Sequence, residues 1–142
     1  MSNYYVSYYN LSPGDRIVIP KSNLRIVQHH TIYLGYDNNG THWIIENVIG
    51  TGVRLITVDD FFRGVTSVTR IEKFQGTNVD RKLAVQNALL KVGKPYDLIN
   101  YNCESFANEV QKGTITSSQV KAGIGVGLGL LVLLLLIGSL SE

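Results

Sequence analysis

The sequence has little cysteine and little net charge. Its 142 residues include one cysteine, Cys103, and 13 lysines and arginines stand against 11 acidic residues, which leaves a net charge of +2. A single cysteine cannot form a disulfide within the chain, so a disulfide-stapled domain is excluded. A net charge this small creates no strong field, and we therefore expect no nucleic-acid partner.

The amino terminus lacks the basic start and the apolar run of a secretory signal. The three histidines, His29, His30 and His42, have no usual zinc spacing, and no second cysteine is available as a ligand. We therefore expect a domain in a reducing compartment, with no metal and no cofactor. In that setting the lone thiol is either a buried apolar residue or a nucleophile.

One long apolar run is present near the end of the sequence. Residues 122–140, AGIGVGLGLLVLLLLIGSL, carry no charged side chain, and about 20 apolar residues in a helix cross the hydrocarbon core of a bilayer. The run predicts a single-pass transmembrane tail anchor. Residues 114–121 are then a short polar linker, and residues 1–113 form the folded domain.

Two further features of this region concern orientation and assembly. Lys112 and Lys121 lie on the amino-terminal side of the apolar run. By the positive-inside rule they predict that the domain lies at the cytosolic face of an intracellular membrane. Gly125 and Gly129 have the GxxxG spacing that allows two helices to approach closely, which favours a weak homodimer.

The remainder of the sequence predicts strands first and helices afterwards. Residues rich in β-branched and aromatic side chains predict a strand at 16–20, a hairpin from 24–36 and 41–48, and further strands within 52–62 and 65–74. The apolar spacing then changes to that of a helix over 80–92, with Asp80 as its cap, and a second helix begins near Asn102. The pattern is α+β, with an antiparallel sheet of about four to six strands followed by two helices.

The position of the cysteine favours reactivity. Asn102 is a good helix cap, which places Cys103 in the first turn of the second helix. Unpaired backbone N–H groups and the helix dipole stabilise an anion there, so the pKa of the thiol is lowered. A nucleophilic thiol also needs a base. His29 and His30 lie on opposite faces of one predicted strand, and this alternation does not decide between them.

Three motifs resemble the lecithin:retinol acyltransferase-like family, which includes the HRAS-like suppressor phospholipase/acyltransferases and has the permuted NlpC/P60 papain-like fold. NCESFANEV, residues 102–110, resembles the cysteine motif of that family, and HHTIYLGY, residues 29–36, resembles its histidine strand. SPGD, residues 12–15, resembles the start of its domain. The resemblance implies that Cys103 is the nucleophile and that His29, four residues before Tyr33, is the general base and acid.

The resemblance also implies an activity. Cys103 would attack an ester of a glycerophospholipid and form a thioester, and the acyl group would pass to water or to an acceptor. This is phospholipase A1/A2 and acyltransferase chemistry at a membrane. Two other functions stay open: a non-catalytic adaptor that recruits or remodels membranes, and a cysteine peptidase or amidase.

The sequence departs from the family at the residue that orients the base, where a second histidine is usual. If the hairpin turn centres near Asn39, paired positions sum to about 78, so that Glu46 faces Ile32 and His42 faces Tyr36. Glu46 follows an aromatic-aliphatic-aliphatic run, as the orienting histidine does in the family. We therefore expect Glu46 to orient His29, with His42 as the alternative.

Overall fold

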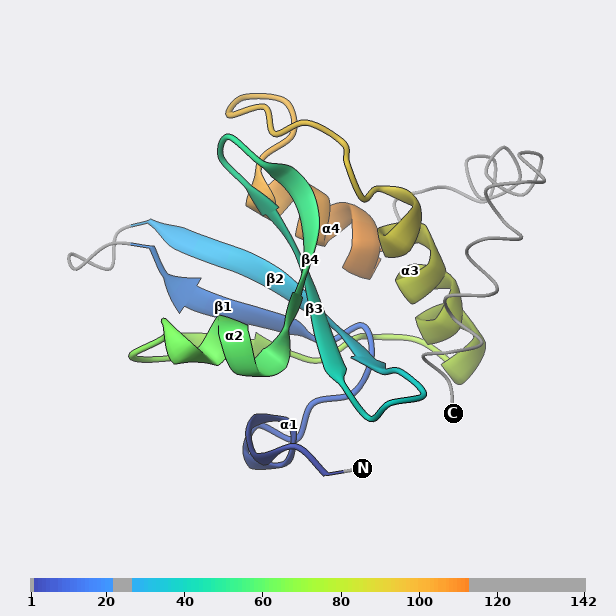
Figure 1. The fold of residues 1–142 in the computed structure, drawn as a ribbon. Helices are drawn as coiled ribbons and strands as arrows, with labels where there is room; N and C mark the ends of the chain where they lie inside the picture. Colours follow the sequence, from blue (N-terminus) through green and yellow to red (C-terminus); the bar gives the residue numbers. More distant parts are fainter. Residues whose placement is uncertain (1, 22–26, 113–142) are drawn as a thin grey trace.

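The structure is a computed structural model that describes residues 2–21 and 27–112 (Figure 1). Its strands are β1 (Arg16–Pro20), β2 (Gln28–Tyr36), β3 (His42–Val48), β4 (Gly52–Thr57) and β5 (Arg70–Glu72). Its helices are α1 (Tyr4–Tyr8), α2 (Val58–Arg63), α3 (Asn78–Leu90) and α4 (Cys103–Lys112). The α+β class is confirmed, and the sheet has five strands.

The sheet is antiparallel in the order β4-β3-β2-β1-β5, and helices cover both of its faces. One apolar cluster joins α3 and α4 to the sheet through Ile32, Ile45 and Phe106. A second cluster joins α2 to the opposite face through Ile17, Tyr33, Ile44 and Phe62, and Tyr5 of α1 packs against it. Figure 1 shows α1 and α2 on one side of the sheet and α3 and α4 on the other. The central strand β2 is therefore buried from both sides.

The predicted run of strands before two helices is wrong in two places. The apolar stretch 52–62 is a strand only as far as Thr57, and Val58–Arg63 is the helix α2. Thr57 caps α2, because its side chain accepts a hydrogen bond from the amide of Asp60 at 3.1 Å. Within 65–74 only Arg70–Glu72 is a strand. The short helix α1, which Asn3 caps, was not predicted.

Both predicted helices are present, with one correction to a cap. The helix expected over 80–92 is α3, Asn78–Leu90, and its cap is Thr77 rather than Asp80. Asp80 lies in the first turn, and its carboxylate accepts a hydrogen bond from the amide of Thr77 at 2.9 Å, which completes a capping box. The second helix, α4, begins at Cys103 as expected.

The register of the β2–β3 hairpin changes along its length. Near the turn, Tyr36 faces His42 as predicted. A β-bulge between Tyr33 and Gly35 then shifts the pairing by one residue, so that Glu46 faces Thr31 and not the predicted Ile32. Because a shift of one residue exchanges the faces of a strand, the bulge places Glu46 on the face of Thr31 and His29.

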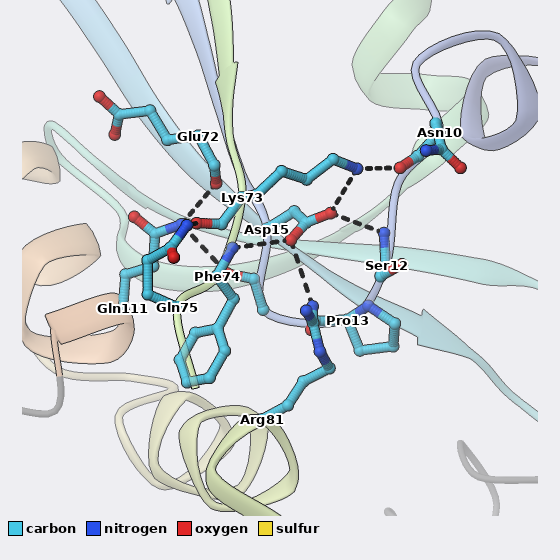
Figure 2. Close-up of polar contacts among 11 residues, drawn as sticks. Asn10, Ser12, Pro13, Asp15, Glu72, Lys73, Phe74, Gln75, Arg81 and Gln111 are labelled. Atoms are coloured by element: carbon cyan, nitrogen blue, oxygen red, sulfur yellow. Dashed lines mark hydrogen bonds and ion pairs between the residues drawn. The ribbon is translucent and has the colours of Figure 1, made fainter. Parts of the chain in front are cut away.

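A buried carboxylate ties the start of the fold to α3 and to the segment that follows β5 (Figure 2). Asp15 is fully buried and accepts hydrogen bonds from the amides of Ser12 at 2.8 Å and Phe74 at 2.9 Å. It also pairs with Lys73 at 3.0 Å and Arg81 at 3.2 Å. Burial would raise the pKa of Asp15, but these hydrogen bonds outweigh burial and hold the pKa below its usual value.

The predicted linker 114–121 and the predicted anchor 122–140 lie outside the described residues. Among residues 2–21 and 27–112, no helix is long and apolar enough to cross a membrane.

Candidate active site

Cys103 opens α4 in the way that the sequence predicts. The side chain of Asn102 accepts a hydrogen bond from the amide of Ser105 at 2.9 Å, which makes Asn102 the helix cap. The thiol of Cys103 is 5% exposed and donates to the carbonyl of Gln28 at 3.8 Å. The nucleophile candidate on α4 therefore contacts the first residue of β2.

The sheet opens where Cys103 approaches it. The pairing of β2 with β3 ends at Thr31 and Glu46, although β2 itself extends back to Gln28. Beyond this pair the backbone of β2 faces the cysteine, since the amide of His30 and the carbonyl of Gln28 both interact with Cys103. This opening brings the start of α4, on one face, close to His29 on the other.

His29 lies between Cys103 and Glu46. Its Nε2 is 2.8 Å from Oε1 of Glu46. An ionised carboxylate only accepts hydrogen bonds, so Nε2 carries the proton in that contact. Nδ1 of His29 is buried and has no hydrogen-bond partner other than the cysteine within the described chain, and the interaction of the ring with Cys103 raises the pKa of His29. Nδ1 is thus the nitrogen that is available to take the thiol proton.

Arg54 holds the other oxygen of Glu46. This residue faces Glu46 across the β3–β4 pair, and its Nε and one terminal nitrogen lie 2.9 and 2.8 Å from Oε2. Burial would raise the pKa of Glu46, but hydrogen bonds from His29 and Arg54 lower it below the usual value. Glu46 is therefore a carboxylate with both oxygens engaged.

The pKa values of the thiol and the imidazole move in opposite directions. Burial would lower the pKa of His29, but the interactions with Cys103 and Glu46 outweigh it and raise that pKa to about 9. Burial would raise the pKa of Cys103, but His29, the amide of His30 and the charge of Lys21 outweigh it and lower that pKa. Both shifts favour a thiolate beside an imidazolium at neutral pH, the state in which a cysteine is most nucleophilic.

The other two histidines lie elsewhere. Nδ1 of His42 is 2.6 Å from the hydroxyl of Tyr33, near the hairpin turn, and Glu46 rather than His42 contacts His29. His30 points to the opposite face of the sheet from His29, where its Nδ1 is 3.3 Å from Arg16. His29 is thus the histidine that the structure brings to Cys103.

Two contacts support the segment that leads into Cys103. The buried side chain of Asn47 donates to the carbonyl of Tyr101 at 2.8 Å. Residues 93 and 94 pair with the edge strand β4, because the amide of Val53 donates to the carbonyl of Lys94 at 2.9 Å. A side chain at Gly52 would lie 2.4 Å from that carbonyl, so this close approach requires glycine.

Sequence reasoning missed Arg54 and Asn47. Arg54 could have been found from the sequence. A turn centred near Gly50 pairs residues whose numbers sum to about 100, and this places Arg54 opposite Glu46. Asn47 had no such signal, because its partner is a backbone carbonyl 54 positions further along the chain.

A cavity of about 530 Å³ lies away from the cysteine, at the far end of β2. It is lined by Tyr33, Tyr36 and His42 of the hairpin, and by residues of α3 that include Arg81. Within the described parts of the chain, no group of three or more His, Cys, Asp and Glu side chains is arranged to hold a metal ion.

The chain is similar to one family of known proteins. Residues 15–112 match a family described as permuted papain-like amidase enzyme, YaeF/YiiX, C92 family. The match includes His29, Glu46 and Cys103. Neither the search of curated proteins nor the search of solved structures finds a match.

Proposed function

The chain belongs to the permuted papain-like amidase family, and we propose that it is a cysteine enzyme that acts on glycerophospholipids. Its activity is that of a phospholipase A1/A2 and acyltransferase, and the reaction passes through a thioester on Cys103. Membership supports a papain-like cysteine enzyme. The lipid substrate is supported by the motifs of residues 29–36 and 102–110 and by the apolar run 122–140.

The observation that carries the catalytic part is the arrangement of three side chains. The ring of His29 interacts with Cys103, its Nε2 contacts Glu46 at 2.8 Å, and its Nδ1 is buried with no other partner among the described residues. This is the order of nucleophile, base and orienting group that a triad requires. The lowered pKa of Cys103 and the raised pKa of His29 supply the charged pair before any substrate binds.

The first half of the reaction forms the acyl-enzyme. The thiolate of Cys103 attacks the ester carbonyl carbon, and the carbonyl oxygen becomes an oxyanion. Backbone amides at the start of α4 are donors for this oxyanion. As the intermediate collapses, the carbon–oxygen bond to the lysophospholipid breaks, and the imidazolium of His29 gives its proton to the leaving alkoxide. The acyl group is then bound to sulfur as a thioester.

The second half releases the acyl group. Neutral His29 accepts a proton from water, which attacks the thioester carbonyl, and the thiolate of Cys103 leaves. The product is a fatty acid, and the charged pair of Cys103 and His29 is restored. An amine or a lysophospholipid in place of water gives the acyltransferase reaction by the same steps.

The location of the enzyme is part of the proposal. Residues 122–140 anchor the chain in an intracellular membrane, with the domain at its cytosolic face and Gly125 and Gly129 in a weak homodimer contact. A tethered domain meets lipid substrate at a high effective concentration. The tether would not raise the effective concentration of a substrate that is dissolved in water.

A second candidate is the hydrolysis of an amide, and the description of the family as an amidase favours it. The steps are the same, except that the leaving group is an amine. Without a proton the nitrogen would have to leave as an amide anion, which is a much poorer leaving group than an alkoxide. Proton transfer from His29 to that nitrogen would therefore matter even more in the first half of the reaction, and the amine leaves as a neutral molecule.

The test uses the full chain reconstituted into phosphatidylcholine vesicles. Intact-mass spectrometry compares the parent with Cys103→Ser and His29→Ala. We expect a mass gain of one fatty acyl group on the parent and lysophosphatidylcholine in the lipid extract, with neither in Cys103→Ser. For His29→Ala we expect the rate of lysolipid release to fall by about a hundredfold or more.

The outcomes separate the candidates. A parent that stays unmodified and releases no lysolipid, although it is folded and inserted, contradicts the phospholipase activity. If such a protein still cleaves amides in a manner that needs Cys103, the amidase candidate replaces it.

A further inference from the structure

The turn that precedes Cys103 exposes two large apolar side chains. Leu98 is 70% exposed and Ile99 is 85% exposed, and they are neighbours in the connection between α3 and α4. A single exposed apolar residue is common on protein surfaces, whereas adjacent exposed apolar residues form a patch of the kind that marks a contact site. The tip lies four residues before the proposed nucleophile.

Hydrogen bonds within the turn fix its backbone conformation, so the side chains of Leu98 and Ile99 are held in an exposed position. Asp97 and Tyr101 exchange backbone hydrogen bonds of 3.0 and 2.9 Å across its base. The carboxylate of Asp97 accepts from the amides of Ile99 and Asn100, each at 3.0 Å. Asn102, which caps α4, donates to the carbonyl of Leu98 at 3.2 Å. The conformation of the tip is thereby tied to the start of the catalytic helix.

Two neighbouring segments add exposed apolar side chains around the same region. The base of the turn contacts the end of β3 through Asn47 and Tyr101, and the β3–β4 turn that follows carries Ile49, which is 57% exposed. Val27 is 52% exposed and precedes Gln28, whose carbonyl contacts Cys103. Figure 1 shows the connection before α4 beside the β3–β4 turn. The apolar tip is therefore part of the surroundings of Cys103.

The charged groups near the tip fit a lipid surface. Lys94 lies over the ring of Tyr101 at 3.5 Å, and Lys21 lies over the ring of Tyr96 at 5.8 Å. Lysines and tyrosines around an apolar tip are typical of the interface between water and lipid headgroups. Of the nearby acids, Asp97 is engaged within the turn and Glu104 lies in the first turn of α4.

The length of the remaining chain allows the tip to reach a bilayer. The helix α4 has ten residues, so Cys103 is about 15 Å from Lys112 at its other end. Residues 113–121 follow, and nine residues span at most about 30 Å when extended. A chain that enters a membrane at residue 122 can thus place the Cys103 end of the domain on the same surface.

We propose that Leu98 and Ile99 insert into the surface of the phospholipid bilayer and hold the Cys103 site against the layer that contains its substrate. This inference rests on the proposed function. The pair acts as an interfacial contact and takes no part in the chemistry. It explains why a rigid turn next to a nucleophile exposes two aliphatic side chains.

The test measures depth in the bilayer, using the fact that Cys103 is the only cysteine. The full chain carrying Cys103→Ser and Ile99→Cys is spin-labelled and reconstituted into phosphatidylcholine and phosphatidylglycerol vesicles. The control carries Cys103→Ser and Val79→Cys, because Val79 is 67% exposed but lies at the start of α3. Collision rates with oxygen, which concentrates in lipid, and with a water-soluble nickel chelate are measured by electron paramagnetic resonance.

We expect the label at position 99 to collide with oxygen and to be shielded from nickel, with the reverse at position 79. A label at 99 that meets nickel as freely as the label at 79 overturns the inference. Both proteins lack the nucleophile, so this result does not depend on whether phospholipids are cleaved. A shielded label with no lysolipid release by the parent would contradict the proposed function and leave the membrane contact in place.

An activity measurement adds a second arm. Leu98→Ser/Ile99→Ser and the control Val79→Ser are assayed on vesicles and on a water-soluble short-chain ester. We expect the ratio of vesicle to soluble activity to fall about tenfold or more in the double variant and to stay at the parent value in Val79→Ser. Equal losses on both substrates would show that the turn supports the site and does not dock to lipid, which also overturns the inference.

Discussion

Oε1 of Glu46 lies 2.8 Å from Nε2 of His29, although the two residues are not directly opposite in the sheet. Thr31 is the direct partner of Glu46, so His29 is its diagonal neighbour, two positions further along β2. The diagonal contact is available because the β2–β3 ladder ends at this pair. The same opening admits Cys103.

Glu46→Gln should abolish most of the activity because of Arg54. Arg54 donates to the position of Oε2, so the new amide turns its oxygen toward Arg54 and its NH₂ group toward His29. Nε2 of His29 then becomes an acceptor, Nδ1 carries the proton, and the imidazole can no longer take a proton from Cys103. We expect kcat to fall about a hundredfold or more in assays of lysolipid release.

The double variant Glu46→Gln/Arg54→Met tests this explanation. Without the guanidinium, the amide oxygen is free to accept from His29, so part of the lost activity should return. If the double variant is no more active than Glu46→Gln, the activity depends on the negative charge of Glu46 and not on which group at position 46 faces His29. His42→Gln serves as the comparison, and a larger loss there in a folded protein would transfer the orienting role to His42.

Arg54→Met alone should move the acidic limb of the pH profile. Burial raises the pKa of Glu46, and the hydrogen bonds of His29 and Arg54 lower it. When Arg54 is removed, that pKa rises, so Glu46 becomes protonated at a higher pH. Its support for the imidazolium is present above this pKa and is lost as the pH falls through it.

We therefore expect the acidic limb of kcat/KM to shift to higher pH in Arg54→Met. The control is Arg63→Met, because Arg63 pairs with Asp60 on the exposed surface of α2. A loss of activity that is equal at every pH would mean that Arg54 contributes only to folding.

The thiol of Cys103 should react with iodoacetamide at a pH where an ordinary cysteine is protonated. Its lowered pKa means that the alkylation rate reaches a plateau below the pH at which a free thiol does so. His29→Ala removes the largest lowering interaction and leaves burial, so the plateau should move to higher pH. The same chain unfolded in urea gives the ordinary thiol curve. A parent curve that coincides with it would contradict the charged pair.

The sequence was sufficient for the two local features that place Cys103. The cap Asn102 and the helix that begins at Cys103 depend on local preferences, which is why their positions were predicted correctly. The helix α2 was missed because Val58, Phe61 and Phe62 also favour strands. They are buried on one face of a helix, where packing outweighs local preference.

The register of the hairpin shows a different limit. Near the turn the numbers of paired residues sum to 78, as they do for Tyr36 and His42. From Tyr33 onward, beyond the bulge, the numbers of paired residues sum to 77. Without the bulge, Glu46 would lie opposite Ile32, on the face of His30, and could not reach His29. Gly35, which has a φ of +108°, lies at the bulge and is the residue type that favours one. A glycine alone does not fix where the register shifts, so the contact between His29 and Glu46 could not be derived from spacing alone.

Gly52→Ala should disturb the site from a distance, through the segment that leads to Cys103. Gly52 has a φ of +83°, and an added Cβ would lie 2.4 Å from the carbonyl oxygen of Lys94. The clash forces residues 93 and 94 away from β4 and breaks the hydrogen bond from Val53 to Lys94. Since this segment continues to the cap of α4, both stability and the placement of Cys103 should suffer.

Gly50→Ala is the matched control for this effect. Gly50 has a nearly equal φ of +80°, but nothing lies within 4 Å of an added Cβ. Both variants therefore carry the same backbone strain, and their difference isolates the contact with Lys94. We expect urea denaturation to show Gly52→Ala less stable than Gly50→Ala by about 1–3 kcal/mol, with a larger loss of kcat. Equal stability and equal kcat would show that residues 93 and 94 move without a cost in stability, and that their pairing with β4 does not position Cys103.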